Sequence, residues 1–452
     1  MTAAAATPAQ VQADRYLAIF NRGDPAAYAA FVHAHWPSFS ATDDEFAGKA
    51  DRSRDQSGGY DRVEILRADD TTLVEVVKAH LADDYFRLEF HVAATTDHPI
   101  ERVVLTPIPR PAEAPPPARL PTPALIRLVS RNIDAMGDFS GAVLIARDGR
   151  VVYARAEGFA DRERRIPNAV TTRFRMASMG KMFTAVAVMQ LVQSGKLDLG
   201  APIGAYLHDY PNAETARSVT IAQLLTHTGG TGDFMSQKWA DNISRLNTPA
   251  DYVAMFGDRA PAFPPGSRFD YSNFGFVILG RVVEVVSGQA YEVYLRDHVF
   301  RPAGMFHSGI DSPPDQPVEL AKPYVKTKLG YDPPPEPFRH GATPAGGAFS
   351  TVADMLAFAE ALDHHVLLDK AHTELMITPK VQGDDSPDGY GFQIRSSNGV
   401  RDVGHDGGGP GENGGLRILD DGKAVVVVLT NVAPTWRAKL AEVIAARVKL
   451  TD

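Results

Sequence analysis

The stretch "RFRMASMGKMF" (residues 173–183) sets a serine and a lysine three positions apart at the start of a long apolar run. Residues i and i+3 share one face of a helix, so the Lys181 amine can reach the Ser178 hydroxyl. The positive end of the helix dipole favours an alkoxide at Ser178, and a lysine kept from solvent can act as a base. A helix N-cap followed by a surface lysine would give the same two residues at the same spacing, so this motif alone leaves both interpretations open.

A second polar group, Tyr271-Ser272-Asn273, lies in "FPPGSRFDYSNFGF" (263–276), between aromatic residues and glycines. A tyrosine beside an amine can have a lowered phenol pKa and relay a proton. Asn273 offers both a donor and an acceptor to a substrate amide. Taken alone, the segment also fits an aromatic core residue followed by a turn asparagine.

The third group lies in "VGHDGGGPGENGG" (403–415), which we interpret as an edge strand running into a glycine loop. His405 could supply a cationic or hydrogen-bonding group. Gly407 and Gly408 would let a substrate approach the backbone, where a free N–H can help to form an oxyanion hole. A phosphate-binding loop is disfavoured, because no G-K-[ST] follows and the strand–loop–helix order is missing.

In this order the three groups resemble the serine β-lactamase and penicillin-binding-protein superfamily, whose signature is S-x-x-K, then Y-x-N, then K-T-G or H-x-G. Three further segments resemble the same family: "VTIAQLLTHTGGTGDF" (219–234), "PAGGAFSTVADMLAFAEAL" (344–362) and "DGYGF" (388–392). The resemblance covers about residues 123 to 450. It is closest to the class C-related branch of esterases, D-amino-acid peptidases and D-Ala-D-Ala carboxypeptidases.

The resemblance implies a two-subdomain α/β (α+β) fold, with an antiparallel sheet built from both ends of the hydrolase region, flanking helices and an all-helical subdomain. It also implies a serine hydrolase without a cofactor or metal. Ser178 would be the acylated nucleophile and Lys181 the amine that helps to deprotonate it. Tyr271 would be the general base for acylation and the proton donor to the leaving group. Asn273 would bind the acyl-side amide of the substrate or support Lys181.

His405 stands where β-lactamases usually have lysine, and the N–H groups of Ser178 and Gly408 would form the oxyanion hole. Histidine lacks the permanent charge of lysine, so a strong carboxylate clamp is less expected. We therefore expect carboxylesterase-like activity first, a D-amino-acid peptidase or D-Ala-D-Ala carboxypeptidase second and weak β-lactamase activity last. A non-catalytic ligand-binding or regulatory member of the fold is the alternative from another class; the intact serine, lysine and tyrosine count against it.

The proline-rich stretch "TPIPRPAEAPPPARLPTP" (106–123) suits an extended linker better than a helix or a central strand. We therefore expect a small N-terminal domain over residues 1–107, a linker over 108–122 and the hydrolase domain over 123–452. In the hydrolase domain the patterns predict a helix over 123–136, a hairpin over 140–161 that turns at Asp148-Gly149, and a helix over 178–195 that begins at the serine. They also predict three strands of one antiparallel sheet, over 400–406, 415–421 and 423–432, and a C-terminal helix over 435–450.

The N-terminal region has helical apolar spacing over residues 9–34. Four alternating runs follow, which predict an antiparallel meander packed on a helix: 60–69, 72–81, 85–93 and 100–108. This small α+β domain lacks a recognisable catalytic constellation and resembles the NTF2-like domains that precede some bacterial serine hydrolases. A structural role, or a role in forming a homodimer, is favoured over a role in substrate access.

Composition excludes several other functions. The 452 residues are 44% hydrophobic, which is enough for a large core, and the formal net charge of -9 disfavours nucleic acid and anionic membranes as partners. The chain has no cysteine, which excludes disulfides, thiolate zinc sites and a cysteine nucleophile. We find no signal peptide and no membrane span, so we expect a cytoplasmic protein as written, or a periplasmic or secreted one if a leader has been removed; the compartment itself stays open. The expected partner is a small-molecule or short peptide substrate.

Overall fold

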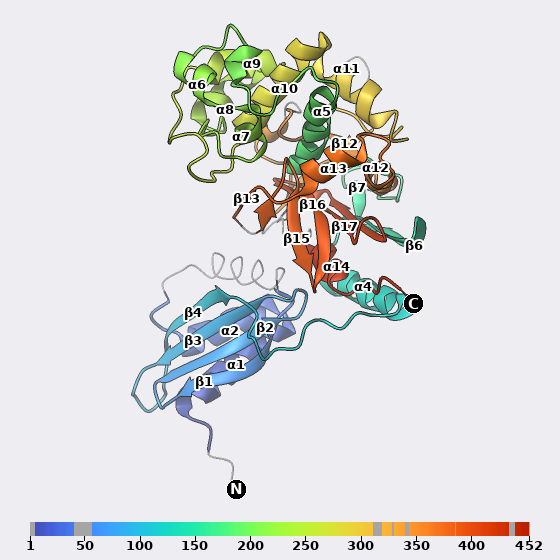
Figure 1. Ribbon diagram of the computed structural model, residues 1–452. Coiled ribbons are helices and arrows are strands. Elements are labelled where there is room, and N and C mark those ends of the chain that lie inside the picture. The colour runs from blue at the N-terminus through green and yellow to red at the C-terminus, as the bar shows by residue number, and fades with distance from the viewer. Residues whose placement is uncertain are drawn as a thin grey trace. The chain divides into compact units, whose positions relative to one another are not determined.

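The computed structural model describes residues 5–39, 57–310, 319–327, 330–339, 343–384, 386–433 and 439–451. The described residues form two compact units (Figure 1). One contains those of Met1–Arg119, Arg127–Gly137 and Thr327–Gly330, and the other contains the rest of the described chain. Helix α4 (Thr122–Met136) begins in the second unit and continues in the first.

The first unit begins with two helices, α1 (Pro8–Arg22) and α2 (Pro25–His35). The prediction of one helix over residues 9–34 is therefore wrong in detail. Gly23 ends α1 in the left-handed conformation, with φ at 68°. The Asp24 carboxylate then caps α2 by accepting the N–H groups of Ala26 and Ala27. Glycine as a C-cap and aspartate before a proline are strong stop and start signals, which outweigh the continuous apolar spacing.

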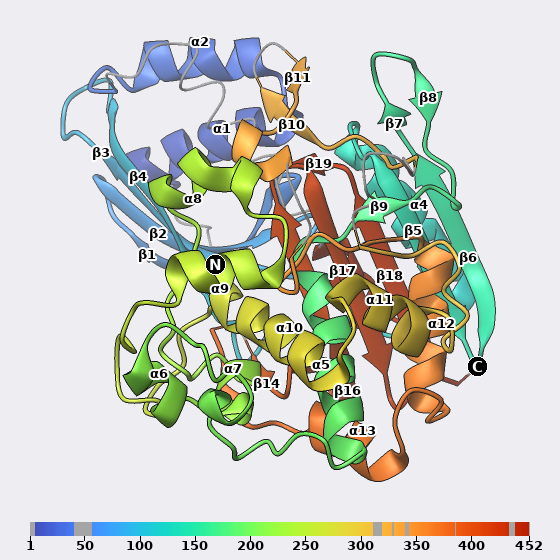
Figure 2. The ribbon, with the colours of Figure 1, turned by 90° about the horizontal axis from the view of Figure 1, so that it is seen from above.

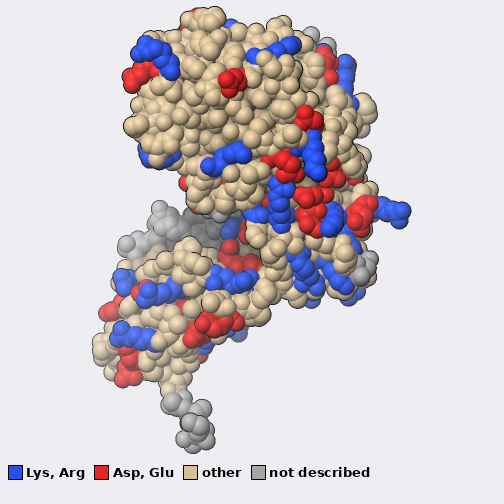
Figure 3. All heavy atoms as spheres, in the orientation of Figure 1, with Lys and Arg blue, Asp and Glu red and all other residues tan. Residues whose placement is uncertain are grey.

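The predicted meander is confirmed. Strands β1 (Tyr60–Ala68), β2 (Thr72–Ala79), β3 (Tyr85–Val92) and β4 (Ile100–Ile108) pair in sequence order, each antiparallel to the next. Helix α1 packs against the first three strands and stacks Phe20 on Tyr60, with ring centroids 5.5 Å apart. Positive and negative side chains are interspersed over the visible face of this unit (Figure 3).

The second unit is built on an eight-stranded sheet in the order β13-β14-β15-β16-β17-β18-β5-β6. Strand β18 is the last strand of this sheet in the sequence. It pairs antiparallel with β5, the first strand of the first hairpin, from Ala424↔Arg147 to Thr430↔Gly141. The prediction of one antiparallel sheet built from both ends of the hydrolase region is thus confirmed, and Figure 2 shows these strands side by side. The bounds are β5 (Gly141–Arg147), β6 (Arg150–Glu157), β13 (Val381–Gln382), β14 (Pro387–Asp388), β15 (Gln393–Ser397), β16 (Val400–Gly409), β17 (Glu412–Leu419) and β18 (Ala424–Thr430).

Helices and short strands complete the second unit. Helices α6 to α11 form the predicted all-helical subdomain, which lies at one end of the unit (Figure 1). Helix α12 packs on β18 and β5, and α14 packs on β17 and β18. The helices are α5 (Lys181–Gln193), α6 (Ala213–Ser218), α7 (Ile221–Leu225), α8 (Gln237–Asn242), α9 (Pro249–Phe256), α10 (Asn273–Ser287), α11 (Tyr291–Leu295), α12 (Val352–Asp363), α13 (Lys370–Ile377) and α14 (Lys439–Ala445). Short 3-10 or π segments are η1 (Ala177–Gly180), η2 (Ile203–Ala205), η3 (Ile243–Arg245), η4 (Arg296–Phe300) and η5 (Glu336–Arg339). The remaining strands are β7 (Phe159–Asp161), β8 (Ile166–Pro167), β9 (Phe174–Arg175), β10 (Tyr324–Thr327), β11 (Gly330–Asp332), β12 (Phe349–Ser350) and β19 (Val432–Ala433).

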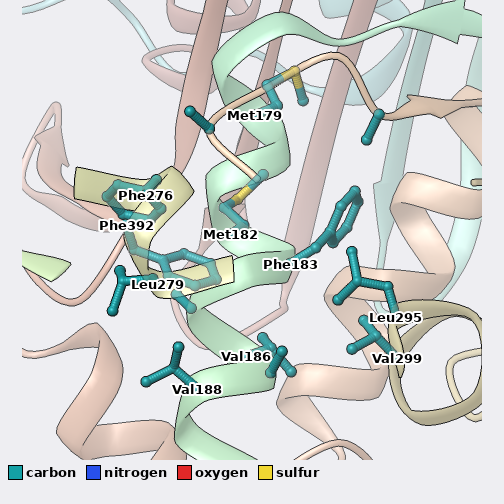
Figure 4. Close-up of a cluster of buried hydrophobic side chains, with 14 of the residues drawn as sticks. Met179, Met182, Phe183, Val186, Val188, Phe276, Leu279, Leu295, Val299 and Phe392 are labelled. Atoms are coloured by element: carbon teal, nitrogen blue, oxygen red, sulfur yellow. The ribbon is translucent and has the colours of Figure 1, made fainter. Parts of the chain in front are cut away.

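The core of the second unit surrounds helix α5, whose sequence KMFTAVAVMQLVQ is apolar on nearly every side. A helix of this kind is buried all round rather than lying on a surface. Figure 4 shows Phe276 and Leu279 of α10 on one side of α5, and Leu295 and Val299 on the other. Lys181, the first residue of α5, is therefore placed in the interior by its helix.

The position of strand β16 differs from the prediction made for the third sequence motif. The segment from 403 onward was predicted to be an edge strand entering a glycine loop, but β16 is an inner strand that continues through Gly409, opposite Glu412 of β17. On its other side, pairing with β15 stops at Gln393↔Gly404. The glycines beyond Gly404 therefore keep strand geometry while pairing with one strand, β17.

Among the described helices, none is by itself long and apolar enough to cross a membrane; α10 with the segment Tyr291–Phe300 passes that test only as a pair bent by 78°.

Candidate active site

Ser178 lies in the 3-10 turn η1, directly before α5. It does not serve as a helix N-cap, because Met176 is the N-cap of η1 and Gly180 is the N-cap of α5. The preceding residue, Ala177, has a φ of 43°, a left-handed conformation that is costly for a residue with a Cβ atom. Hydrogen bonds to the segment of Gly347 and Ala348 hold this conformation from both sides: the Met176 N–H donates to the Ala348 carbonyl, and the Gly347 N–H donates to the Ala177 carbonyl.

Lys181 is fully buried one turn below Ser178. Its Nζ lies 3.1 Å from the Ser178 Oγ, 2.8 Å from the Asn273 Oδ1 and 2.6 Å from the Ala345 carbonyl oxygen. Burial lowers the pKa of the Lys181 amine from 10.5 to about 7, because a desolvated ammonium loses its hydration. A substantial fraction of the amine is therefore neutral near pH 7.

The three contacts of Lys181 define where its lone pair points. A neutral amine has two N–H donors and one lone pair. A carbonyl oxygen only accepts hydrogen bonds, so the contacts to Ala345 and Asn273 use both donors. The lone pair is left facing the Ser178 hydroxyl, which is the geometry that a general base needs.

Tyr271 directly precedes Ser272, the N-cap of α10, whose hydroxyl accepts the Gly275 N–H. Its phenol is hydrogen-bonded to Ser178, and its ring centroid lies 4.7 Å from the Lys181 Nζ. The expectation that a neighbouring amine lowers the phenol pKa is wrong: burial raises the pKa of Tyr271 well above its ordinary value. Tyr271 therefore keeps its proton at neutral pH and is suited to donate it.

His227 lies under the Tyr271 ring, with centroids 4.3 Å apart and planes 24° from parallel. The Nδ1 atom accepts the backbone N–H of Ser272 over 3.0 Å, which makes Nε2 the protonated nitrogen. Burial and the neighbouring Lys181 keep the pKa of His227 well below its ordinary value. The ring is a neutral support that fixes the position of Tyr271.

Asn273 is the first residue of α10 and supports Lys181, one of the two roles expected for it. Its Nδ2 atom donates to the Asp233 Oδ2 over 2.8 Å. Asp233 was not singled out from the sequence, although it lies inside the family-like segment 219–234. The signal available there was a single acid between glycines and a phenylalanine.

His405 lies on β16 with 4% of its surface exposed. Burial, together with the nearby Lys181, lowers the pKa of its imidazole to about 3. The cationic role considered for His405 is therefore disfavoured, because the ring is neutral near pH 7. Its Nδ1 atom contacts the carbonyl oxygen of Asp406, and His405 is not among the described residues that line the cavity.

Gly407 and Gly408 occupy different surroundings on β16. A Cβ atom on Gly407 would lie 2.2 Å from the Met176 carbonyl oxygen, so a side chain there would collide with the turn that carries Ser178. Gly408 lines the same cavity as Ser178. An oxyanion hole formed by the N–H groups of Ser178 and Gly408 remains a prediction.

Ser178, Tyr271 and Asn273 open into a cavity of about 280 Å³. One wall is apolar and is formed by Phe234, Met235, Trp239, Tyr252 and Phe338. The cavity is also lined by Arg175 and Glu412, whose Nε and Oε1 atoms lie 3.7 Å apart. Sequence reasoning missed these two residues, since nothing in β9 or the β16–β17 turn indicates that they meet.

A buried lysine whose lone pair faces a serine, at the start of a central helix beside an antiparallel sheet, is the arrangement of S-x-x-K serine hydrolases. The chain belongs to the β-lactamase family, which it matches over residues 129–449. It is thus a hydrolase related to β-lactamases and penicillin-binding proteins.

Individual relatives agree with this placement. The chain is 33% identical over 286 residues to penicillin-binding protein 4 of Amycolatopsis lactamdurans, covering 58% of this chain and 74% of that protein. It is 33% identical over 258 residues to esterase EstB of Burkholderia gladioli, covering 49% of this chain and 65% of EstB. The solved structure of a penicillin-binding protein from Bacillus halodurans matches with a TM-score of 0.62 at 31% identity, covering 72% of this chain and 99% of that one. The family match begins after residue 107, so the NTF2-like resemblance stays a prediction.

Proposed function

We propose that the protein is a carboxylesterase-like hydrolase that works through an acyl-enzyme on Ser178. The observation that carries this proposal is the pair of contacts from Lys181 to the Ala345 carbonyl oxygen and the Asn273 amide oxygen, which leave its lone pair facing the Ser178 hydroxyl. A pKa of about 7 matches such a base to neutral pH, where proton transfer is most effective.

The reaction proceeds in two acyl transfers. Lys181 takes the Ser178 proton while Oγ attacks the ester carbonyl, and Tyr271 gives its proton to the departing alcohol as the C–O bond breaks. Tyr271 recovers a proton from the Lys181 ammonium. Water then attacks the acyl-enzyme, the same groups remove its proton, and the carboxylic acid leaves as Ser178 is reprotonated.

The charges of the cavity favour a substrate without a carboxylate on the leaving group. Arg175 is the one lysine or arginine among the described residues that line the cavity, and it lies beside Glu412. His405, which stands at the position of the usual lysine, is buried and neutral. D-Ala-D-Ala peptides and β-lactams both carry a carboxylate that needs a cation, so a neutral ester fits better.

The apolar wall favours an apolar substituent on the substrate. Its aromatic rings contact one another, with the Trp239 and Phe338 centroids 5.2 Å apart and those of Phe234 and Tyr252 5.0 Å apart. Burying a short acyl chain there contributes about 0.8 kcal/mol per methylene group. We therefore expect butyrate esters to be better substrates than acetate esters.

Turnover of p-nitrophenyl acetate and butyrate by the wild type and by Ser178→Ala tests the proposal. Wild-type turnover should be lost in Ser178→Ala and retained in Ser267→Ala, which alters an exposed serine. A fluorophosphonate label, mapped by mass spectrometry, should be found on Ser178. Equal turnover by wild type and Ser178→Ala, or a label on another residue, would contradict the assignment.

A substrate panel tests the finer assignment. The panel contains p-nitrophenyl butyrate, D-amino-acid p-nitroanilides, a D-Ala-D-Ala peptide and nitrocefin. We expect the largest kcat/KM for the ester. A larger kcat/KM for the D-Ala-D-Ala peptide or for nitrocefin would show that a carboxylate is recognised and would replace the esterase assignment.

A further inference from the structure

Asp233 lies in the turn between α7 and α8, and each of its carboxylate oxygens has defined donors. Oδ1 accepts the backbone N–H groups of Phe234 and Met235, over 2.6 and 3.2 Å. Oδ2 accepts the Nδ2 of Asn273 over 2.8 Å and the backbone N–H of Asn273 over 3.4 Å. The backbone carbonyl of Asp233 accepts the Arg259 Nη1 over 2.7 Å, which ties the turn to the segment after α9. The carboxylate is therefore fixed from its own turn and from the start of α10.

This contact decides which way the Asn273 amide faces. An ionised carboxylate only accepts hydrogen bonds, so it must face the amide nitrogen rather than the amide oxygen. The amide oxygen then has to face Lys181, where it takes one of the amine's two N–H donors. With the amide turned over, Nδ2 would donate to the amine and occupy the lone pair that Ser178 needs.

Asp233 is also the charged group that acts on Lys181. Four titratable groups on different elements face the amine: Asp233 before α8, Tyr271 before α10, His227 after α7 and His405 on β16. Burial keeps both histidines and the tyrosine neutral near pH 7. The negative charge of Asp233 raises the pKa of Lys181 against the effect of burial.

We propose that Asp233 is a positioning residue for the hydrolytic reaction: it locks the Asn273 amide so that the Lys181 lone pair faces Ser178. This inference rests on the proposed function of Ser178 and Lys181. Asp233 acts through Asn273 and does not contact the reacting atoms.

Asp233→Asn tests the proposal, because the new side chain keeps the shape and the Oδ1 acceptor of the turn but removes the charge and the obligate acceptor. We expect kcat for p-nitrophenyl butyrate to fall about tenfold or more, with KM nearly unchanged, as a fraction of the molecules holds the amide turned over. The acid limb of the kcat/KM profile should move to lower pH by about half a unit to one unit, since an opposite charge is lost. Asp241→Asn, an exposed aspartate on α8, should change neither quantity.

A second variant moves the profile in the opposite direction. Asn273→Asp puts a carboxylate beside the Lys181 Nζ and should move the acid limb to higher pH. The pH dependence of fluorophosphonate labelling at Ser178 supplies the same readout without turnover. An acid limb of Asp233→Asn that coincides with that of the wild type, or a loss confined to KM, would overturn the role of Asp233. Absence of Ser178-dependent turnover and labelling in the wild type would instead overturn the proposed function.

Discussion

The lowered pKa of Lys181 reduces the free energy of unfolding of the protein. In the unfolded chain its amine is protonated up to about pH 10, while in the folded protein its pKa is about 7. Between these two values the unfolded state binds more protons, so the free energy of unfolding rises with pH by about 1.4 kcal/mol per unit from this group. The site therefore gains a neutral amine near pH 7 at the expense of stability, a common trade between activity and stability.

Lys181→Met should remove this pH dependence together with the activity. The stability of the variant relative to the wild type should grow as the pH falls from about 10 to about 7, by about 1.4 kcal/mol per unit, and should level off below that. Urea unfolding of both proteins at pH 7, 8 and 9 measures the difference, in which other titrating groups cancel. A difference that is constant across these pH values would show that Lys181 is charged in the folded protein.

Tyr271 is expected to act as an acid, because its raised pKa keeps the phenol protonated. Tyr271→Phe should therefore lower kcat about a hundredfold or more for an alkyl ester, whose alkoxide needs a proton in order to leave. The loss should be much smaller for a p-nitrophenyl ester, whose phenolate leaves without one. Comparing kcat for ethyl butyrate and p-nitrophenyl butyrate measures the contrast. Equal losses for both esters would indicate that Tyr271 serves the attack rather than the departure.

At the scale of elements, the site depends on how closely β16 approaches the turn η1. A Cβ atom on Gly407 would lie 2.2 Å from the Met176 carbonyl oxygen, whereas one on Gly409 would find its nearest neighbour, the Glu412 carbonyl oxygen, at 3.7 Å. Behind β16 the carboxylate of Asp406 is held by two hydrogen bonds from Arg417, at 2.6 and 3.0 Å, and by one from Arg395 at 2.8 Å. Arg395 lies on β15 and Arg417 on β17, so these ion pairs hold β16 in place within its sheet.

Gly407→Ala should accordingly destabilise the protein, by about 2 kcal/mol or more, and abolish turnover by displacing Ser178. Gly409→Ala is the matched control and should leave Tm within a few degrees of the wild type. Thermal unfolding and p-nitrophenyl butyrate turnover measure both effects. A Tm for Gly407→Ala equal to that of Gly409→Ala would mean that η1 and β16 are not in rigid contact.

At the scale of the whole molecule, the parts that sequence predicted well are those that local chemistry defines. The alternating strands, the Asp148-Gly149 turn and the long apolar run after Ser178 each have a local pattern that can be recognised in isolation. Contacts made by distant segments could not be predicted in this way. Asp233 meets Asn273 across 40 positions, and Arg175 meets Glu412 only after β9 and β17 are in place. The protonation states of His405 and Tyr271 follow from burial, which no short motif records.

The division of the chain into domains is the remaining question at this scale. Leu120 and Thr122 are tied to the hydrolase unit, since the Leu120 N–H donates to the Arg447 carbonyl and the Arg147 Nη1 donates to the Thr122 hydroxyl, each over 2.8 Å. A chain of residues 108–452 keeps these contacts, whereas a chain of residues 127–452 loses them. We expect the chain of residues 108–452 to unfold cooperatively and to keep kcat/KM for p-nitrophenyl butyrate within about twofold of the full chain, as a separate domain should. The chain of residues 127–452 should have a lower Tm. Failure of the 108–452 chain to fold would show that residues 1–107 share a core with the hydrolase unit. Equal Tm values for the two truncated chains would show that the hydrogen bonds at residues 120–122 do not stabilise the hydrolase unit.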